Sequence, residues 1–96
     1  MAQQAKHIRR MLVVDDHAAA RESVADVLRQ AGHEAICASS ASEALGLLTR
    51  NEFQVIVTDL QMPGMDGLEF IRQIHHRNLR VQVIMVTAHA TIASAV

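Results

Sequence analysis

Short apolar runs alternate along this chain with longer segments that have helical periodicity. Met11–Val14 shows no polar alternation, as expected of a strand that is covered on both faces. The next segment ends at Gly32 and carries its apolar residues on one helical stripe, namely Ala20, Val24, Val27, Leu28 and Ala31. The first part of the sequence therefore predicts a buried strand followed by an amphipathic helix.

A second strand and a second helix are predicted next. Residues His33–Ala38 form a shorter and less apolar run, which is typical of an edge strand. Ser40 and Glu43 then have the spacing of a capping box at the start of a helix. The apolar residues of this predicted helix are Ala44, Leu45, Leu47 and Leu48.

A third strand is predicted at Phe53–Thr58, and a third helix should begin near Asp66, with Glu69 three residues later. We expect Asn78 to end this helix. The residues that we expect to face inward from it are Leu68, Ile71 and Ile74.

The repeated alternation predicts an α/β fold with a doubly wound parallel sheet. Val81–Val86 is the predicted fourth strand, ending at Thr87, and residues 90–96 resemble the opening of a fourth helix. Right-handed crossovers can place the first strand beside the third, so that ligands bind beyond their carboxyl ends. With 96 residues, we expect one domain over 11–96 after a polar leader, 1–10.

Composition narrows the class of protein. Half of the residues are apolar, a fifth are charged and the formal net charge is −1, so we expect a globular domain with no direct nucleic-acid contact. The single cysteine, Cys37, excludes an internal disulfide and fits buried packing in a reducing compartment. Lys6, Arg9 and Arg10 precede a run of only four apolar residues, which ends at two aspartates. This run is too short for a signal peptide or a membrane span, so we expect a cytoplasmic protein.

Carboxylates follow two of the predicted strands, Asp15 and Asp16 after the first and Asp59 after the third. Like charges in one crevice are costly without a cation, so the arrangement suggests a divalent metal and a phosphoryl group. Mg²⁺ prefers oxygen ligands, which Asp16, Asp59 and the backbone carbonyl of Gln61 could supply, with Asp15 orienting a metal-bound water. A carboxylate such as Asp59 can attack phosphorus, and Thr87 could add a hydroxyl donor from the side.

Each of these residues also has a simpler interpretation. Asp15 and Asp16 at a strand end are a common helix cap, Asp59 before a Pro-Gly turn is a common turn residue, and Thr87 resembles an ordinary loop hydroxyl. Their joint occurrence at the carboxyl ends of three predicted parallel strands favours a site.

The six histidines show no zinc-site spacing. His75 and His76 are adjacent, so they face different sides of a helix and cannot form a ligand pair. We interpret all six as solvated or half-buried, with His17 and His89 near the rim of the site.

Val13-Val14-Asp15-Asp16, the stretch from Val57 to Gly67 and Val86-Thr87-Ala88 together resemble the receiver domain of two-component response regulators. The resemblance spans nearly the whole chain and implies a flavodoxin-like sheet with strand order 2-1-3-4. It implies a signalling switch, not a turnover enzyme, that a partner sensor histidine kinase phosphorylates. Residues 87–91 further resemble enhancer-binding transcriptional activators of the nitrogen-regulation type.

The resemblance also implies a role for each candidate site residue. Asp59 would accept the phosphoryl group, and Asp15 and Asp16 would form the acidic Mg²⁺ pocket with it. Gln61 would lend its backbone carbonyl to the metal, and Thr87 would bond a phosphoryl oxygen when the domain switches.

The sequence departs from the family's pattern at its end. Receivers have a fifth strand, whose lysine pairs with the phosphoryl group, and a fifth helix, but this sequence stops before either and its only lysine is Lys6. We therefore expect a truncated fragment with the fifth strand and helix missing. Its fourth strand would be an exposed edge, through which we expect a homodimer or other self-association.

Two other functions compete with the signalling switch. One is a truncated, phosphorylation-impaired fragment that acts only through dimer contacts. The other is a metal-dependent phosphatase with an aspartyl nucleophile, which would need a general acid near Asp59 that Leu60 and Gln61 do not offer.

Overall fold

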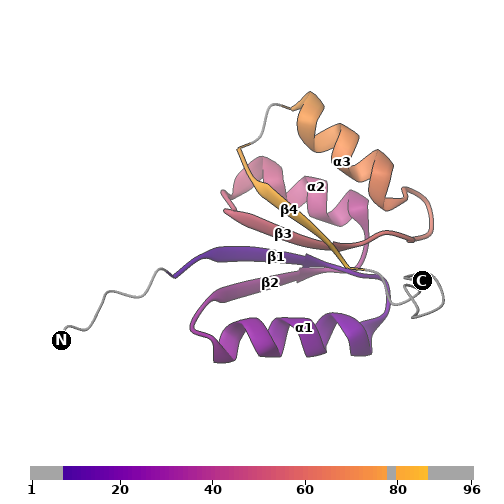
Figure 1. Cartoon of the computed structure of the whole chain (residues 1–96). Coiled ribbons are helices and arrows are strands. Elements are labelled where there is room, and N and C mark those ends of the chain that lie inside the picture. The colour runs from indigo at the N-terminus through magenta and orange to yellow at the C-terminus, as the bar shows by residue number, and fades with distance from the viewer. Residues whose placement is uncertain (1–7, 78–79, 87–96) are drawn as a thin grey trace, which may run out of the picture.

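Four parallel strands and three helices make up the part of the chain that the computed structural model describes, residues 8–77 and 80–86 (Figure 1). In chain order they are β1 (Arg10–Val14), α1 (Ala18–Gln30), β2 (Glu34–Ala38), α2 (Ala41–Arg50), β3 (Val55–Asp59), α3 (Gly67–His76) and β4 (Gln82–Val86). The strand order is β2-β1-β3-β4, so the predicted flavodoxin-like order 2-1-3-4 is confirmed. Thr87 and the predicted fourth helix lie outside the described residues.

Helices cover both faces of the sheet, with α1 on one face and α2 and α3 on the other (Figure 1). Because successive side chains of a strand point to opposite faces, β1 and β3 contribute to both layers. Leu12, Val14 and Ile56 pack with α2 and α3, whereas Met11 and Val57 belong to clusters that α1 covers. The two central strands are therefore buried, as their unbroken apolar runs predict.

The inward face of α1 differs from the predicted stripe. Val27 is 63% exposed and Ala31 is also exposed, while Ala25 is wholly buried against the sheet. Val24 and Leu28 pack beside Ala25, as part of the same layer. The buried stripe is therefore rotated toward Ala25, a small residue that hydropathy alone does not single out. Cys37 is half-buried in this layer, less than predicted.

The inward face of α3 is also partly different from the prediction. Leu68 is 62% exposed, Ile71 is half-buried, and Ile74 is buried as predicted. Phe70 is fully buried and was not predicted to face inward. The apolar face therefore follows Phe70 and Ile74, one turn apart, and Leu68 falls on the solvent side. The helix ends at His76 with Arg77 as its C-cap, and Asn78 lies outside the described residues.

The predicted helix starts of α2 and α3 are confirmed. Ser40 Oγ accepts a hydrogen bond of 3.0 Å from the Glu43 backbone N–H, and Asp66 Oδ1 accepts one of 2.9 Å from the Glu69 backbone N–H. These bonds satisfy N–H groups that have no partner within the first turn of a helix.

β4 lies at an edge of the sheet and pairs with β3. Its exposure alternates along the strand, with Ile84 47% and Val86 46% exposed.

No helix within the described residues has both the length and the apolar composition needed to cross a membrane.

Candidate functional site

The carboxyl ends of β1 and β3 lie side by side, which sets the position of the candidate site. Val14 pairs with Thr58 in the parallel register, so Asp15 and Asp59 follow at the same level of the sheet. Asp59 is itself the last residue of β3 and pairs with Val86 of β4. The register thus gathers residues that are more than forty positions apart in the sequence.

Asp59 is a charged residue in a buried position. It is only 5% exposed, and the one hydrogen bond to its carboxylate within the described residues comes from the Gln61 backbone N–H, at 3.5 Å. A donor at that distance is at the limit of a hydrogen bond and stabilises a carboxylate weakly. Burial of a charge with so little support costs folding free energy, which makes Asp59 a candidate site residue.

Asp15 is fixed mainly through its backbone. Its N–H donates to the Ala38 carbonyl at 3.2 Å, and its own carbonyl accepts a bond of 2.8 Å from the Arg21 guanidinium. Its Oδ1 atom accepts a bond of 2.9 Å from the His17 backbone N–H, which turns the chain at the end of β1. Arg21 thereby holds the start of α1 against the loop that carries the acids.

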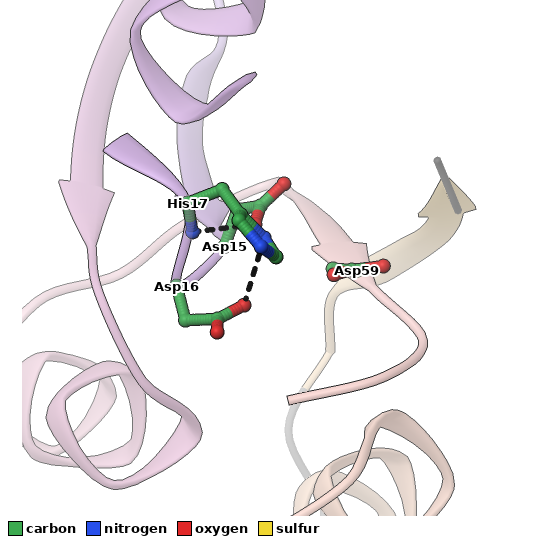
Figure 2. A group of neighbouring side chains, drawn as sticks. All are labelled: Asp15, Asp16, His17 and Asp59. Carbon is green, nitrogen blue, oxygen red and sulfur yellow. Dashed lines mark hydrogen bonds and ion pairs between the residues drawn. The ribbon is translucent and has the colours of Figure 1, made fainter. Parts of the chain in front are cut away.

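Asp16 carries the least satisfied polar atom of the site. Its Oδ1 atom is buried and has no hydrogen-bond partner among the described residues. His17 Nδ1 lies 3.3 Å from it and 3.4 Å from Asp15 Oδ1, within ion-pair distance but without a hydrogen bond to Asp16 (Figure 2). These contacts become charge pairs only when the imidazole is protonated.

Four side chains converge at this end of the sheet, Asp15, Asp16, His17 and Asp59 (Figure 2). One possible ligand atom from each lies within 4.8 Å of the others. The three carboxylates are those that the sequence analysis expected to meet. The sequence predicted His17 only near the rim of the site. Its spacing to the other histidines gives no sign of a metal site, and the signal lies instead in the two acids directly before it.

The helix-cap interpretation of the aspartate pair does not hold for α1. The N-cap residue of α1 is His17, with extended backbone angles (φ −91°, ψ 114°), and its side chain makes no capping hydrogen bond. Asp15 and Asp16 precede this position, and their side chains gather with Asp59 at the cluster.

Gln61 and Thr87 complete the set of predicted site residues. Gln61 contributes the N–H that reaches Asp59, while the role of its carbonyl stays a prediction. Thr87, like His89, lies outside the described residues, directly after Val86 in the sequence.

Gly67, the first residue of α3, lies against the backbone of Asp59 and Leu60, a contact that the sequence did not predict. Its N–H donates to the Leu60 carbonyl at 2.7 Å, and an added Cβ would lie 2.8 Å from Leu60 Cα and 2.9 Å from the Asp59 carbonyl oxygen. Only glycine permits the first turn of α3 to approach the end of β3 so closely.

The donor set fits a hard divalent cation. Carboxylate oxygens are the ligands that Mg²⁺ and Ca²⁺ prefer, and the Asp16 oxygen without a partner and the weakly bonded Asp59 carboxylate are both available to a cation. A cation there would also offset the repulsion among three neighbouring negative charges.

Comparisons with known proteins agree with this geometry. The family model for the response regulator receiver domain matches residues 11–96. The response regulator protein FleR of Pseudomonas aeruginosa is 37% identical over 87 residues, which are 91% of this chain and 18% of FleR. The sensor histidine kinase RcsC of Escherichia coli is 38% identical over 80 residues, 83% of this chain and 8% of RcsC. This chain therefore spans less than a fifth of the length of either relative.

Solved structures show the same fold. A response regulator receiver protein from Pseudomonas putida superimposes with a TM-score of 0.80 at 31% identity, covering 95% of this chain and 77% of that one. The response regulator TrrA of Thermotoga maritima, solved in complex with Mg²⁺-BeF, gives a TM-score of 0.81 at 31% identity, covering 86% of this chain and 72% of that one.

Proposed function

This chain belongs to the response regulator receiver domain family, and from that premise we propose that Asp59 is the phosphoacceptor of a two-component signalling switch. The observation that carries the proposal is the buried and weakly hydrogen-bonded Asp59 carboxylate beside two further acids. A fold selected only for stability would not gather three negative charges at one point of its sheet.

The proposed reaction is the transfer of one phosphoryl group to Asp59. A carboxylate oxygen attacks phosphorus in line with the bond to the donor, which is the P–N bond of a phosphohistidine on a partner sensor histidine kinase. The new O–P bond gives an acyl phosphate, and the imidazole of the donor leaves and takes a proton from water. The end of β3 holds the attacking oxygen in place, because Thr58 and Asp59 are buried on both faces of the sheet.

We assign the metal pocket of this reaction to Asp16, Asp59 and the backbone carbonyl of Gln61, with Asp15 acting through a metal-bound water. When bound there, Mg²⁺ would supply positive charge that offsets the negative charge of the incoming phosphoryl oxygens. The His17 backbone N–H holds the Asp15 carboxylate in position for this role by donating to its Oδ1 atom.

We propose that Thr87 responds to phosphorylation of Asp59. Its hydroxyl would donate to a phosphoryl oxygen on Asp59, and it follows Val86, the residue of β4 that pairs with Asp59. A change at this point would reach the surface around β4 directly, where a partner or an output domain could detect it.

Mass spectrometry after incubation with a small acyl phosphate and Mg²⁺ tests the proposal. We expect the mass of one added phosphoryl group, no addition in Asp59→Asn, and no addition in a chelator. Asp66→Asn is the matched control, because it removes a carboxylate seven residues away while asparagine can still cap α3. A chain that folds and binds Mg²⁺ but gains no mass would favour the phosphorylation-impaired fragment instead.

We also propose that β4 associates with a second copy of the chain. Support comes from its edge position and from the exposed side chains of Ile84 and Val86. Sedimentation velocity should show dimers that Ile84→Lys dissociates, whereas Val27→Lys, which alters an exposed apolar residue of α1, should leave them intact. A monomer at high micromolar concentration would contradict this proposal.

A further inference from the structure

His17 brings a nitrogen ligand into a pocket that is otherwise lined by carboxylates. This nitrogen is a poor ligand for Mg²⁺, because that ion takes oxygen ligands almost exclusively. Imidazole instead suits Zn²⁺ and the other late first-row divalent metals. We propose that Asp15, Asp16, His17 and Asp59 form a second metal-binding mode, in which such an ion, represented here by Zn²⁺, displaces Mg²⁺ and blocks phosphorylation.

Two distances within the cluster match the spacing of a zinc site, and all four candidate ligand atoms lie within 4.8 Å of one another. His17 Nδ1 lies 3.3 Å from Asp16 Oδ1 and 3.4 Å from Asp15 Oδ1. Ligands at tetrahedral corners around an ion with bonds of about 2.0–2.1 Å are roughly 3.3–3.4 Å apart, whereas neighbouring octahedral ligands at the same bond length are only about 2.9 Å apart. The nitrogen thus already sits at tetrahedral spacing from two carboxylate oxygens.

Two of the three acids, Asp16 and Asp59, carry oxygens with little or no hydrogen bonding within the described residues. Asp59 is only 5% exposed, and within residues 8–77 and 80–86 its carboxylate has a single hydrogen bond, at 3.5 Å, while Asp16 Oδ1 is buried with no hydrogen bond. The observation on Asp59 is independent of His17, whereas Asp16 Oδ1 is the atom that lies 3.3 Å from His17 Nδ1. The imidazole of His17 does not cap α1 and its side chain is 67% exposed, so an ion can reach it; among the described residues its ion-pair contacts are with Asp15 and Asp16, the two acids that would share the ion.

Occupation of all four positions by protein ligands would make a closed site, as structural zinc sites are. The phosphoryl-accepting carboxylate of Asp59 would then be a metal ligand, and no position would be left for a phosphoryl oxygen. The proposed consequence is inhibition by Zn²⁺ at low concentration, with His17 setting the preference between the two metals. Imidazolium pairing with the acids, with no metal role, is the competing explanation of the same contacts.

Calorimetric titration of the metal-free chain with Zn²⁺ and separately with Mg²⁺ tests the inference. His17→Gln should weaken Zn²⁺ binding at least tenfold, since even indirect metal partners are worth about 10–100-fold, and should leave Mg²⁺ binding unchanged. The double variant His75→Gln/His76→Gln is the matched control, because it removes two exposed imidazoles of α3 that could take Zn²⁺ adventitiously. Equal Zn²⁺ affinity in the wild type and His17→Gln would overturn the inference.

A second measurement needs no variant. Long-range ¹H–¹⁵N spectra of the wild type should show the His17 Nδ1 resonance shifting on addition of one equivalent of Zn²⁺ and not on addition of Mg²⁺. An unchanged ring nitrogen with bound Zn²⁺ would contradict direct ligation. Phosphorylation in excess Mg²⁺ should also fall on addition of Zn²⁺ in the wild type and persist in His17→Gln.

This inference rests on the proposed metal pocket, but the two fail differently. If neither metal binds the wild type, the pocket itself and the inference are both wrong. If Mg²⁺ binds and Asp59 is phosphorylated while Zn²⁺ affinity does not depend on His17, only the inference is wrong.

Discussion

The amino terminus of α1 and those of α2 and α3 use polar side chains in opposite ways. Ser40 and Asp66 turn inward on their own helices and accept backbone N–H groups of the first turn. At α1 the cap position is occupied by His17, which makes no side-chain cap, and the two acids before it gather with Asp59. Short polar side chains therefore cap α2 and α3, whereas those before α1 make no cap.

The difference separates cap residues, which stabilise the fold, from the acids at the end of β1, which we propose serve phosphorylation. A cap residue contributes folding free energy by satisfying an N–H group that has no other partner. The acids at the end of β1 add charge repulsion instead, because their oxygens lie within 4.8 Å of one another and of Asp59. Substitutions in the two kinds of region should therefore change stability with opposite signs.

The largest effect is expected at Gly67, where the start of α3 touches the end of β3. Gly67→Ala should destabilise the chain by about 1–3 kcal/mol, because the new methyl group meets backbone atoms of Asp59 and Leu60 that cannot move aside without disturbing β3. Urea denaturation measures the loss. Gly46→Ala is the control, since that glycine of α2 has open space around it and alanine favours a helix by about 0.5–1 kcal/mol. Equal responses at the two glycines would contradict the close contact.

The helix caps come next. Ser40→Ala and Asp66→Ala should each lower the free energy of unfolding by about 1 kcal/mol, because each leaves an N–H group of the first turn without its acceptor. His17→Ala should change it little, since its side chain caps nothing. A loss at His17 as large as at Ser40 would remove the distinction between the three helices.

Asp16→Asn should have the opposite sign. Without metal, this variant should be more stable than the wild type by up to about 1 kcal/mol, because it removes one of three neighbouring charges that solvent only partly screens. Mg²⁺ should raise the melting temperature of the wild type and have little effect on the variant. Calorimetry with and without Mg²⁺ measures both, and a variant destabilised in the absence of metal would show that Asp16 supports the fold.

The sequence predicted the elements whose signals are local or strongly periodic. Ser40 and Asp66 were identified by their spacing to Glu43 and Glu69, and the unbroken apolar runs located the two central strands. These features depend on residues within one turn of each other, or on burial from both faces, so the sequence alone carries them.

Features that depend on the distance between layers were predicted less well. On α1, hydropathy favours Val27 over Ala25, but packing against the sheet buries the smaller residue. On α3, the apolar stripe could be drawn through Leu68 or through Phe70, and packing against the sheet selects Phe70. Gly67 escaped notice for the same reason, since nothing in the sequence shows how near its helix lies to β3.

The smallest expected effect depends on pH and concerns Glu43 at the start of α2. The backbone N–H of Ser39, followed by its hydroxyl, donates to the Glu43 carboxylate and lowers its pKa below the ordinary value of 4.5. An acidic group whose pKa is lower in the folded chain stabilises the fold at pH values above its pKa in the unfolded chain. This contribution is lost as the pH falls through its pKa in the folded chain. Because Glu43 is exposed, we expect only a few tenths of a kcal/mol.

Urea denaturation of the wild type and Glu43→Gln at neutral pH and at about pH 3.5, below the ordinary pKa of glutamate in an unfolded chain, measures this contribution. The stability difference between the two proteins should shrink at the acid pH. Ser39→Ala should remove only part of it, because the backbone N–H remains as a donor. If the difference is the same at both pH values, then Glu43 acts through hydrogen bonds that its neutral form keeps. Its charge would then add nothing to a helix start whose cap is already supplied by Ser40.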